Sequence, residues 1–142
     1  YFYHNNIMYD NIIIMPPKKI RPEYAPKSLT PADRKKQVKS IKEGKERPKV
    51  DSFKSKRSSH VIKFEKRYGT KITDDAFISK NLLSKTGINK ILSKGRGAYY
   101  GAGSRPNQTA ASWARARLAS ALTGGAAAKV DKDILEKHKI KK

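Results

Sequence analysis

Prolines and glycines divide this chain into short segments, and this punctuation constrains its fold more than any other feature of the sequence. Residues 15–29 hold four prolines, which disfavour a helix there and favour an extended, polyproline-like backbone. Further along, Gly44, Gly69 and Gly87 each end a stretch of apolar residues at helical spacing. We therefore expect short helices between these breaks.

Apolar residues between these breaks recur at intervals of three and four, which predicts helices. Thr30 and Thr109 carry side-chain oxygens that can cap the helices after them, and Pro31 suits a first helical position. No segment shows the period-two alternation of a strand. We expect helices at residues 31–43, 60–68, 73–86, 88–92, 110–122 and 131–138. The predicted fold class is mainly α.

The helical segments are concentrated in the C-terminal part of the chain. We expect a small helical domain at residues 59–142, with a glycine-rich loop at 94–106. A long extended basic N-terminal arm with one short helix is expected at residues 1–58. The first part of this arm, residues 1–14, has no Lys or Arg. It is either an upstream reading-frame extension before a start at Met15 or part of a cleaved precursor.

The charge of the chain points to an acidic partner. The chain has 33 Lys and Arg residues against 12 Asp and Glu residues, which gives a net charge of +21. Without an acidic partner, these cations repel one another. The partner can be nucleic acid, an anionic membrane surface or an acidic protein surface. The chain has no cysteine, which excludes disulfides, thiol nucleophiles and zinc sites of the cysteine type. Its three histidines lie far apart, so we expect no catalytic residue, no metal site, no cofactor and no enzyme.

The expected glycine-rich loop is the most distinctive segment. It lacks the third glycine of a dinucleotide fingerprint, and no Gly-Lys-Ser/Thr follows. One interpretation makes it a binding site, in which Arg96 and Arg105 hold phosphate while Tyr99 and Tyr100 stack on bases. The interpretation we favour is structural: the tyrosines fill the core, and the glycines allow positive φ angles in a tight loop.

The helix expected at 110–122 presents Trp113 and Leu118 on one side, which is typical of a core helix. We expect Arg115 to project away from that side and the stem of Arg117 to line its edge. Contact of the two arginines with phosphate is the less favoured alternative.

Clusters of cations outside the loop are further candidates for partner binding. Each cluster can contact phosphates, lie on an anionic lipid leaflet or stay solvated. The candidate residues in these clusters are Arg34, Lys35, Lys36, Lys54, Lys56 and Arg57, and a further basic run closes the chain at 139–142.

Several stretches resemble a small, uncharacterised basic domain of large double-stranded DNA viruses of algae and protists, and of some phages. They are Gly95–Tyr100, Gly103–Thr109, Ser112–Ala114 and Ala116–Ser120, with Pro26–Leu29 and Lys54–His60 upstream. The resemblance covers residues 26–135 and carries no catalytic residues. It implies a virion structural protein, a minor capsid component that bridges capsid subunits beneath the major capsid shell. The location implied is the capsid interior, after assembly in the host cytoplasm.

The same resemblance implies the partners of the chain. They are the major capsid protein, other minor capsid proteins and an anionic inner membrane. The alternative, which rests on the charge of +21, is a virion protein that binds nucleic acid without sequence preference or condenses DNA.

Overall fold

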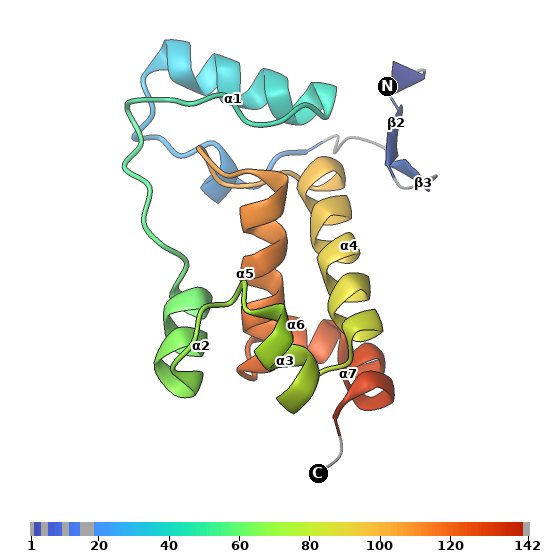
Figure 1. The fold of residues 1–142 in the computed structure, drawn as a ribbon. Helices are drawn as coiled ribbons and strands as arrows, with labels where there is room; N and C mark the ends of the chain where they lie inside the picture. Colours follow the sequence, from blue (N-terminus) through green and yellow to red (C-terminus); the bar gives the residue numbers. More distant parts are fainter. Residues whose placement is uncertain (1, 4–5, 10–11, 15–18, 141–142) are drawn as a thin grey trace. The chain divides into compact units, whose positions relative to one another are not determined.

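The computed structural model describes residues 2–3, 6–9, 12–14 and 19–140, and the protein is mainly α, as the sequence predicts (Figure 1). The helices are η1 (Pro22–Tyr24), α1 (Pro31–Glu43), α2 (Ser59–Tyr68), α3 (Asp75–Asn81), α4 (Lys85–Gly101), α5 (Ala110–Leu122), α6 (Ala126–Val130) and α7 (Lys132–His138). None of these helices is long and apolar enough to cross a membrane, a finding that covers only the residues described.

Three short strands near the N-terminus were not expected from the sequence. They are β1 (Phe2–Tyr3), β2 (Asn6–Tyr9) and β3 (Ile12–Ile14), which pair antiparallel in chain order. Strands of two to four residues are too short for alternation of side chains to be recognised. The other N-terminal residues (1, 4–5, 10–11 and 15–18) lie outside the described residues, and so does Met15, the start considered above.

The caps predicted for α1 are confirmed. The Thr30 side chain accepts a hydrogen bond from the backbone N–H of Asp33 at 3.2 Å, and Pro31 occupies the first helical position. Gly44 ends the helix in the left-handed conformation with φ of 65°. Gly69 ends α2 in the same way, with φ of 67°.

The prediction of a loop at 94–106 is wrong from Lys94 to Gly101, and Gly87 does not end a helix, because α4 runs through both. Two of its glycines, Gly87 and Gly95, allow close packing and do not have positive φ angles. A Cβ atom built on Gly95 would lie 2.6 Å from the Cα atom of Ala114, and one on Gly87 would lie 2.6 Å from the His138 Cβ atom.

The chain forms two compact units. The first unit comprises residues 1–56 with 96–113, and the second comprises 57–95 with 114–142. The domains expected from the sequence are 1–58 and 59–142, whereas the first unit ends its N-terminal stretch at residue 56 and also includes residues 96–113.

In the first unit, residues 19–56 are irregular outside η1 and α1, yet they are packed and not a free arm. Their buried side chains include Tyr24, Leu29, Ile41 and Val50. Asn107 holds this segment: its side chain accepts from the Val50 N–H at 2.7 Å and donates to the Val50 carbonyl at 3.1 Å.

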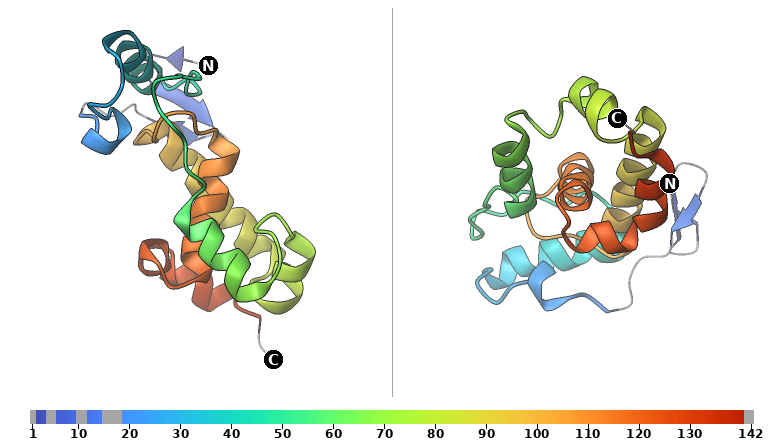
Figure 2. Two further views of the ribbon diagram at one scale, coloured as in Figure 1. Left: turned by 90° about the vertical axis from the view of Figure 1, so that its left-hand side faces the viewer. Right: turned by 90° about the horizontal axis from the view of Figure 1, so that it is seen from below.

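The second unit has the larger apolar core. Views from two further directions show α5 in the middle of this unit, with α2, α3, α4 and α7 around it (Figure 2). The buried side chains at its centre come from α2, α3, α4 and α5 and from Ile72 and Leu83, which lie between helices. They are Val61, Phe64, Ile72, Ile78, Leu83, Ile88, Ile91, Leu92, Ala114, Leu118, Ala119 and Ala121. Ile134 and Leu135 of α7 pack against them partly buried.

A candidate partner-binding groove in the first unit

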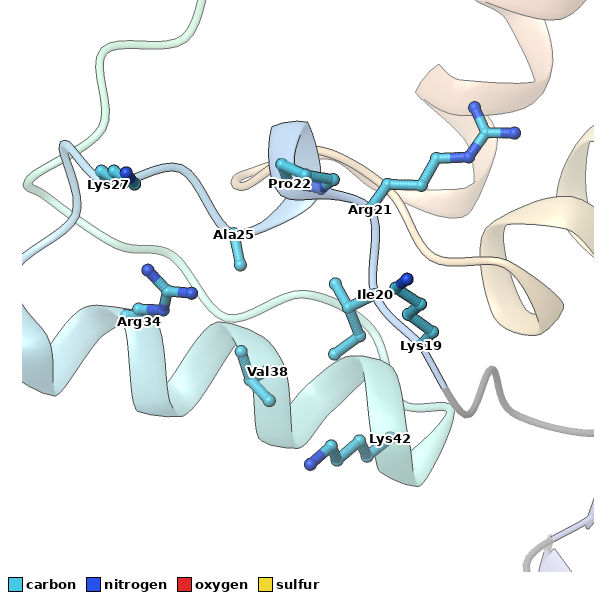
Figure 3. Close-up of a pocket in the computed structure, with 9 residues that line it drawn as sticks. All are labelled: Lys19, Ile20, Arg21, Pro22, Ala25, Lys27, Arg34, Val38 and Lys42. Atoms are coloured by element: carbon cyan, nitrogen blue, oxygen red, sulfur yellow. The ribbon is translucent and has the colours of Figure 1, made fainter.

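A groove of about 510 Å³ lies between α1 and the segment 19–27, which includes η1 (Figure 3). We call it the basic groove. It is lined by Lys19, Ile20, Arg21, Pro22, Ala25, Lys27, Arg34, Val38 and Lys42. Figure 3 shows the side chains of Ile20 and Ala25 directed toward α1, and the side chain of Arg34 reaching from α1 toward the other wall.

The two walls of the basic groove are fixed to each other by Gln37 and Tyr24. The Gln37 side chain is fully buried, and its Nε2 atom donates to the backbone carbonyls of Tyr24 at 2.9 Å and of Ser104 at 3.1 Å. The Tyr24 ring is buried and meets the Trp113 ring edge-on, with centroids 5.8 Å apart. The Gln37 bond thus holds η1 beside α1, and the Trp113 contact holds η1 against the start of α5.

The basic groove combines positive charge with an aliphatic surface. Of the described residues that line it, five are basic and none is acidic. Glu23, next to the groove, lies 3.8 Å from Arg21, and both side chains are largely exposed, so this ion pair contributes little. Ile20, Ala25 and Val38 supply aliphatic surface between the cations. The arrangement can therefore hold a ligand that carries both negative charge and apolar side chains.

The structure places one predicted partner-binding residue, Arg34, in the groove lining and leaves its neighbours Lys35 and Lys36 exposed elsewhere on α1. The sequence analysis missed Lys19, Arg21, Lys27 and Lys42. A signal for part of the site was present, because Arg34, Val38 and Lys42 follow each other at intervals of four and so share one helix face. The opposite wall, segment 19–27, shows no periodic pattern in the sequence. Its place beside α1 depends on a tertiary contact, the bond from Gln37 to the Tyr24 carbonyl.

The predicted partner-binding residues Lys54, Lys56 and Arg57 do not line this groove. Lys54 and Lys56 are exposed, and Arg57 pairs with the carboxylate of Glu65. Hydrogen bonding from Arg57 lowers the pKa of Glu65, so that carboxylate stays ionised and holds the arginine. Of the basic run at the C-terminus, Lys141 and Lys142 lie outside the described residues.

Tyr99 lies in the core, where the structural interpretation of the sequence places it. Its side chain is fully buried, and burial raises the pKa of its hydroxyl. The hydroxyl accepts from the Arg47 backbone N–H at 2.7 Å and donates to the Gln108 carbonyl at 2.8 Å. The Arg47 guanidinium lies 4.5 Å from the centre of the ring.

The other candidates from the expected loop lie outside the basic groove. Tyr100 is half-buried and packs edge-on against Tyr99, with ring centroids 5.0 Å apart. Arg96 is half-buried on α4, and Arg105 is exposed beside the buried Pro106. The structure therefore does not assemble these three residues with Tyr99 into a site for stacking and phosphate binding.

In the second unit, the arginines of α5 are engaged by carboxylates. The Nη1 atom of Arg115 lies 2.6 Å from a carboxylate oxygen of Asp75 and 3.2 Å from the Ile72 carbonyl oxygen. Arg117 donates to Asp131 from Nε at 2.9 Å and from Nη2 at 2.8 Å. Both guanidinium groups are therefore paired with carboxylates of the same unit.

Asp131 is the most buried carboxylate of the described residues, with only 1% of its surface exposed. It also accepts from the Lys94 ammonium, whose nitrogen lies 3.1 Å away. Burial by itself raises the pKa of Asp131, but hydrogen bonds from Arg117 and Lys94 outweigh that effect, and its pKa lies below the ordinary value. This triad is a structural ion pair network.

Among the described residues, no group of three or more His, Asp and Glu side chains could hold a metal ion. A family model described as a family of unknown function (DUF5824) matches residues 28–137. The matched range includes α1 and most of both units, and it begins after the groove wall at 19–27. No curated protein and no solved structure matches the chain.

Proposed function

This chain belongs to the DUF5824 family of unknown function, and we propose that it is a non-catalytic structural protein of a virion. In this proposal it is a minor capsid component that bridges capsid subunits beneath the major shell by binding their acidic surfaces. The observation that carries it is the basic groove, whose described lining combines five basic residues with aliphatic side chains and includes no acidic residue.

Electrostatics supports an acidic protein surface as the partner. A chain of net charge +21 gains from any contact that brings carboxylates close to its cations. One exposed ion pair stabilises a complex by about 0.2–1 kcal/mol, so a groove of this kind binds weakly by itself. A chain that bridges two capsid subunits makes two such contacts at once, and linked contacts bind more stably than either contact alone.

The virion as the setting is supported by the resemblance of Gly95–Tyr100, Gly103–Thr109 and Ser112–Ser120 to the basic domain of large DNA viruses. The major capsid protein and other minor capsid proteins are the proposed partners, and an anionic inner membrane is a further surface for exposed lysines. The host cytoplasm is the proposed place of assembly.

Fractionation of purified virions tests this proposal. Particles are separated gently into shell, membrane and nucleoprotein core at low and at raised salt, and the chain is quantified in each fraction. We expect the chain to stay with the shell through high salt. Release together with the DNA core, with less retained as salt rises, would contradict a capsid role.

A role in binding nucleic acid is the second candidate, favoured by the net charge of +21 and by the exposed lysines Lys35, Lys36, Lys54 and Lys56. It predicts duplex binding without sequence preference and with an affinity that falls about 10³- to 10⁵-fold between about 50 and 200 mM salt. Absence of duplex binding at the lower salt would exclude this candidate.

A further inference from the structure

We infer that the basic groove takes an extended acidic peptide segment of a partner protein, with an aliphatic residue between two acidic ones. The inference rests on the proposed function, because it assumes a protein partner, and it adds the chemistry and spacing that the partner must have. The groove volume of about 510 Å³ is in the range of sites that hold a short peptide stretch or a small ligand.

The spacing comes from α1. Arg34, Val38 and Lys42 line the groove at intervals of four residues, so they follow one another along a single helix face. With a rise of about 1.5 Å per residue, Arg34 and Lys42 lie about 12 Å apart along the helix, and Val38 lies midway.

An extended peptide matches this spacing. Its backbone rises about 3.3 Å per residue, and every second side chain points to the same side. Residues one, three and five of such a segment therefore span about 13 Å on one face. Acidic residues at the first and fifth positions reach Arg34 and Lys42, while an aliphatic residue at the third meets Val38.

The opposite wall favours the same occupant. Ile20 and Ala25 point toward α1, which adds aliphatic surface facing Val38 (Figure 3). Lys19 and Lys27 also line the groove and place two further cations near the ends of the segment 19–27. An aliphatic side chain between carboxylates thus loses its contact with water while both charges stay beside cations.

A nucleic acid strand fits this groove less well. Sites for single strands combine cations with aromatic side chains on which bases stack. None of the nine described residues that line the groove is aromatic, and Tyr24, the aromatic residue of η1, is buried. The phosphates of a strand could pair with the cations of the groove, but its bases would contact aliphatic side chains and have no aromatic ring to stack on.

The test measures binding of three fluorescent probes to the full-length chain by anisotropy. The first probe is a peptide with the core Asp-Ser-Ile-Ser-Asp, the second replaces its Ile by Ser, and the third is a single-stranded oligothymidine. We expect the first peptide to bind more tightly than the other two probes at physiological salt. Tighter binding of the oligothymidine, weakened by loss of the groove cations, would show a nucleic acid site and overturn the inference.

Two double variants with equal charge loss on the same helix provide the control. Arg34→Gln with Lys42→Gln removes two groove cations, and we expect about tenfold weaker binding of the first peptide. Lys35→Gln with Lys36→Gln removes two cations outside the lining, and we expect a change of less than about threefold. Equal weakening by both pairs would mean diffuse electrostatic binding and would overturn the inference.

The variant Val38→Ser isolates the aliphatic contact without changing charge. We expect it to abolish the preference for Ile over Ser in the peptide, and an unchanged preference would contradict the inference. Circular dichroism checks that each variant is folded. If no probe uses the groove while the chain still fractionates with the capsid shell, the inference fails and the proposed function stands.

Discussion

Two glycines on α4, separated by one residue, should respond to the same substitution with opposite signs. Gly95 approaches α5 so closely that a Cβ atom would lie 2.6 Å from the Cα atom of Ala114 and 3.0 Å from its Cβ atom. A Cβ atom on Gly97 would meet nothing within 4 Å. Neither glycine has a positive φ angle, so alanine suits the backbone at both positions.

The magnitudes follow from helix propensity and packing. Gly97→Ala should stabilise the protein by about 0.5–1 kcal/mol, because alanine loses less backbone entropy in a helix. Gly95→Ala has the same gain in helix propensity. Its Cβ atom, however, would clash with backbone atoms of α5, which cannot move aside as a flexible side chain would. Overpacking costs about 1–3 kcal/mol, so we expect Gly95→Ala to destabilise the protein by about 1–2 kcal/mol overall.

Urea unfolding followed by far-ultraviolet circular dichroism measures both variants against the parent chain. The expected difference between them is about 1.5–3 kcal/mol in free energy of unfolding. If residues 94–101 formed a glycine-rich loop with positive φ angles, both substitutions would destabilise the protein. A loss of stability in Gly97→Ala as large as that in Gly95→Ala would refute the helical assignment and the close crossing with α5.

Tyr99→Phe should lower the free energy of unfolding by about 2–4 kcal/mol, because it leaves the Arg47 N–H and the Gln108 carbonyl unpaired in the interior. Tyr68→Phe is the matched control, because it removes one hydrogen bond of 3.4 Å, from the Tyr68 hydroxyl to the Leu122 carbonyl, and should cost less than about 1 kcal/mol. Equal losses of stability in the two variants, measured by urea unfolding, would contradict the buried role of Tyr99. Asp131→Asn should cost about 3 kcal/mol in the same assay, since Arg117 then keeps a half-buried charge without its carboxylate, and an unchanged free energy would exclude that network. The lowered pKa of Asp131 also fixes a pH dependence: its ionised form stabilises the fold above the ordinary value of 3.8, and that contribution is lost as pH falls through the lower folded-state pKa. Urea unfolding between neutral pH and about pH 3 should show this loss, and the loss should be smaller in Asp131→Asn; equal losses would contradict it.

Local sequence signals predicted the local structure well. Thr30 and Gly44 bound α1 where capping chemistry places them, and α5 occupies the predicted residues 110–122. Thr109 caps α5 through a hydrogen bond from the Ser112 N–H at 3.0 Å. Such signals depend on neighbours within four residues, so a single sequence contains them.

The glycines of α4 misled the prediction for a physical reason. In the sequence, Gly87 and Gly95 cannot be told apart from glycines that a loop requires. In the structure they are required because another residue approaches each of them closely. His138 and Ala114, the residues that approach, are 51 and 19 positions away, and nothing in the sequence marks those contacts. Gly103, with φ of 100°, does have the conformation expected of a loop.

The sequence predicted only part of the basic groove, a residue on α1. Arg34 was identified from its basic cluster, whereas the wall at 19–27 depends on the Gln37 side chain and its bonds to Tyr24 and Ser104. Arg115 and Arg117 were placed on α5, but their acidic partners, 40 and 14 residues away, could not be identified from spacing.

The central claim is that the basic groove binds an acidic segment of a capsid protein. A photo-reactive residue at Lys27, which lines the groove, tests it most directly in assembled virions, with the same residue at the exposed Lys35 as the control. We predict that Lys27 crosslinks to a segment of a capsid protein in which acidic residues flank an aliphatic one, and that Lys35 does not. Crosslinks from Lys27 to DNA, or equal crosslinking from both positions, would contradict the account.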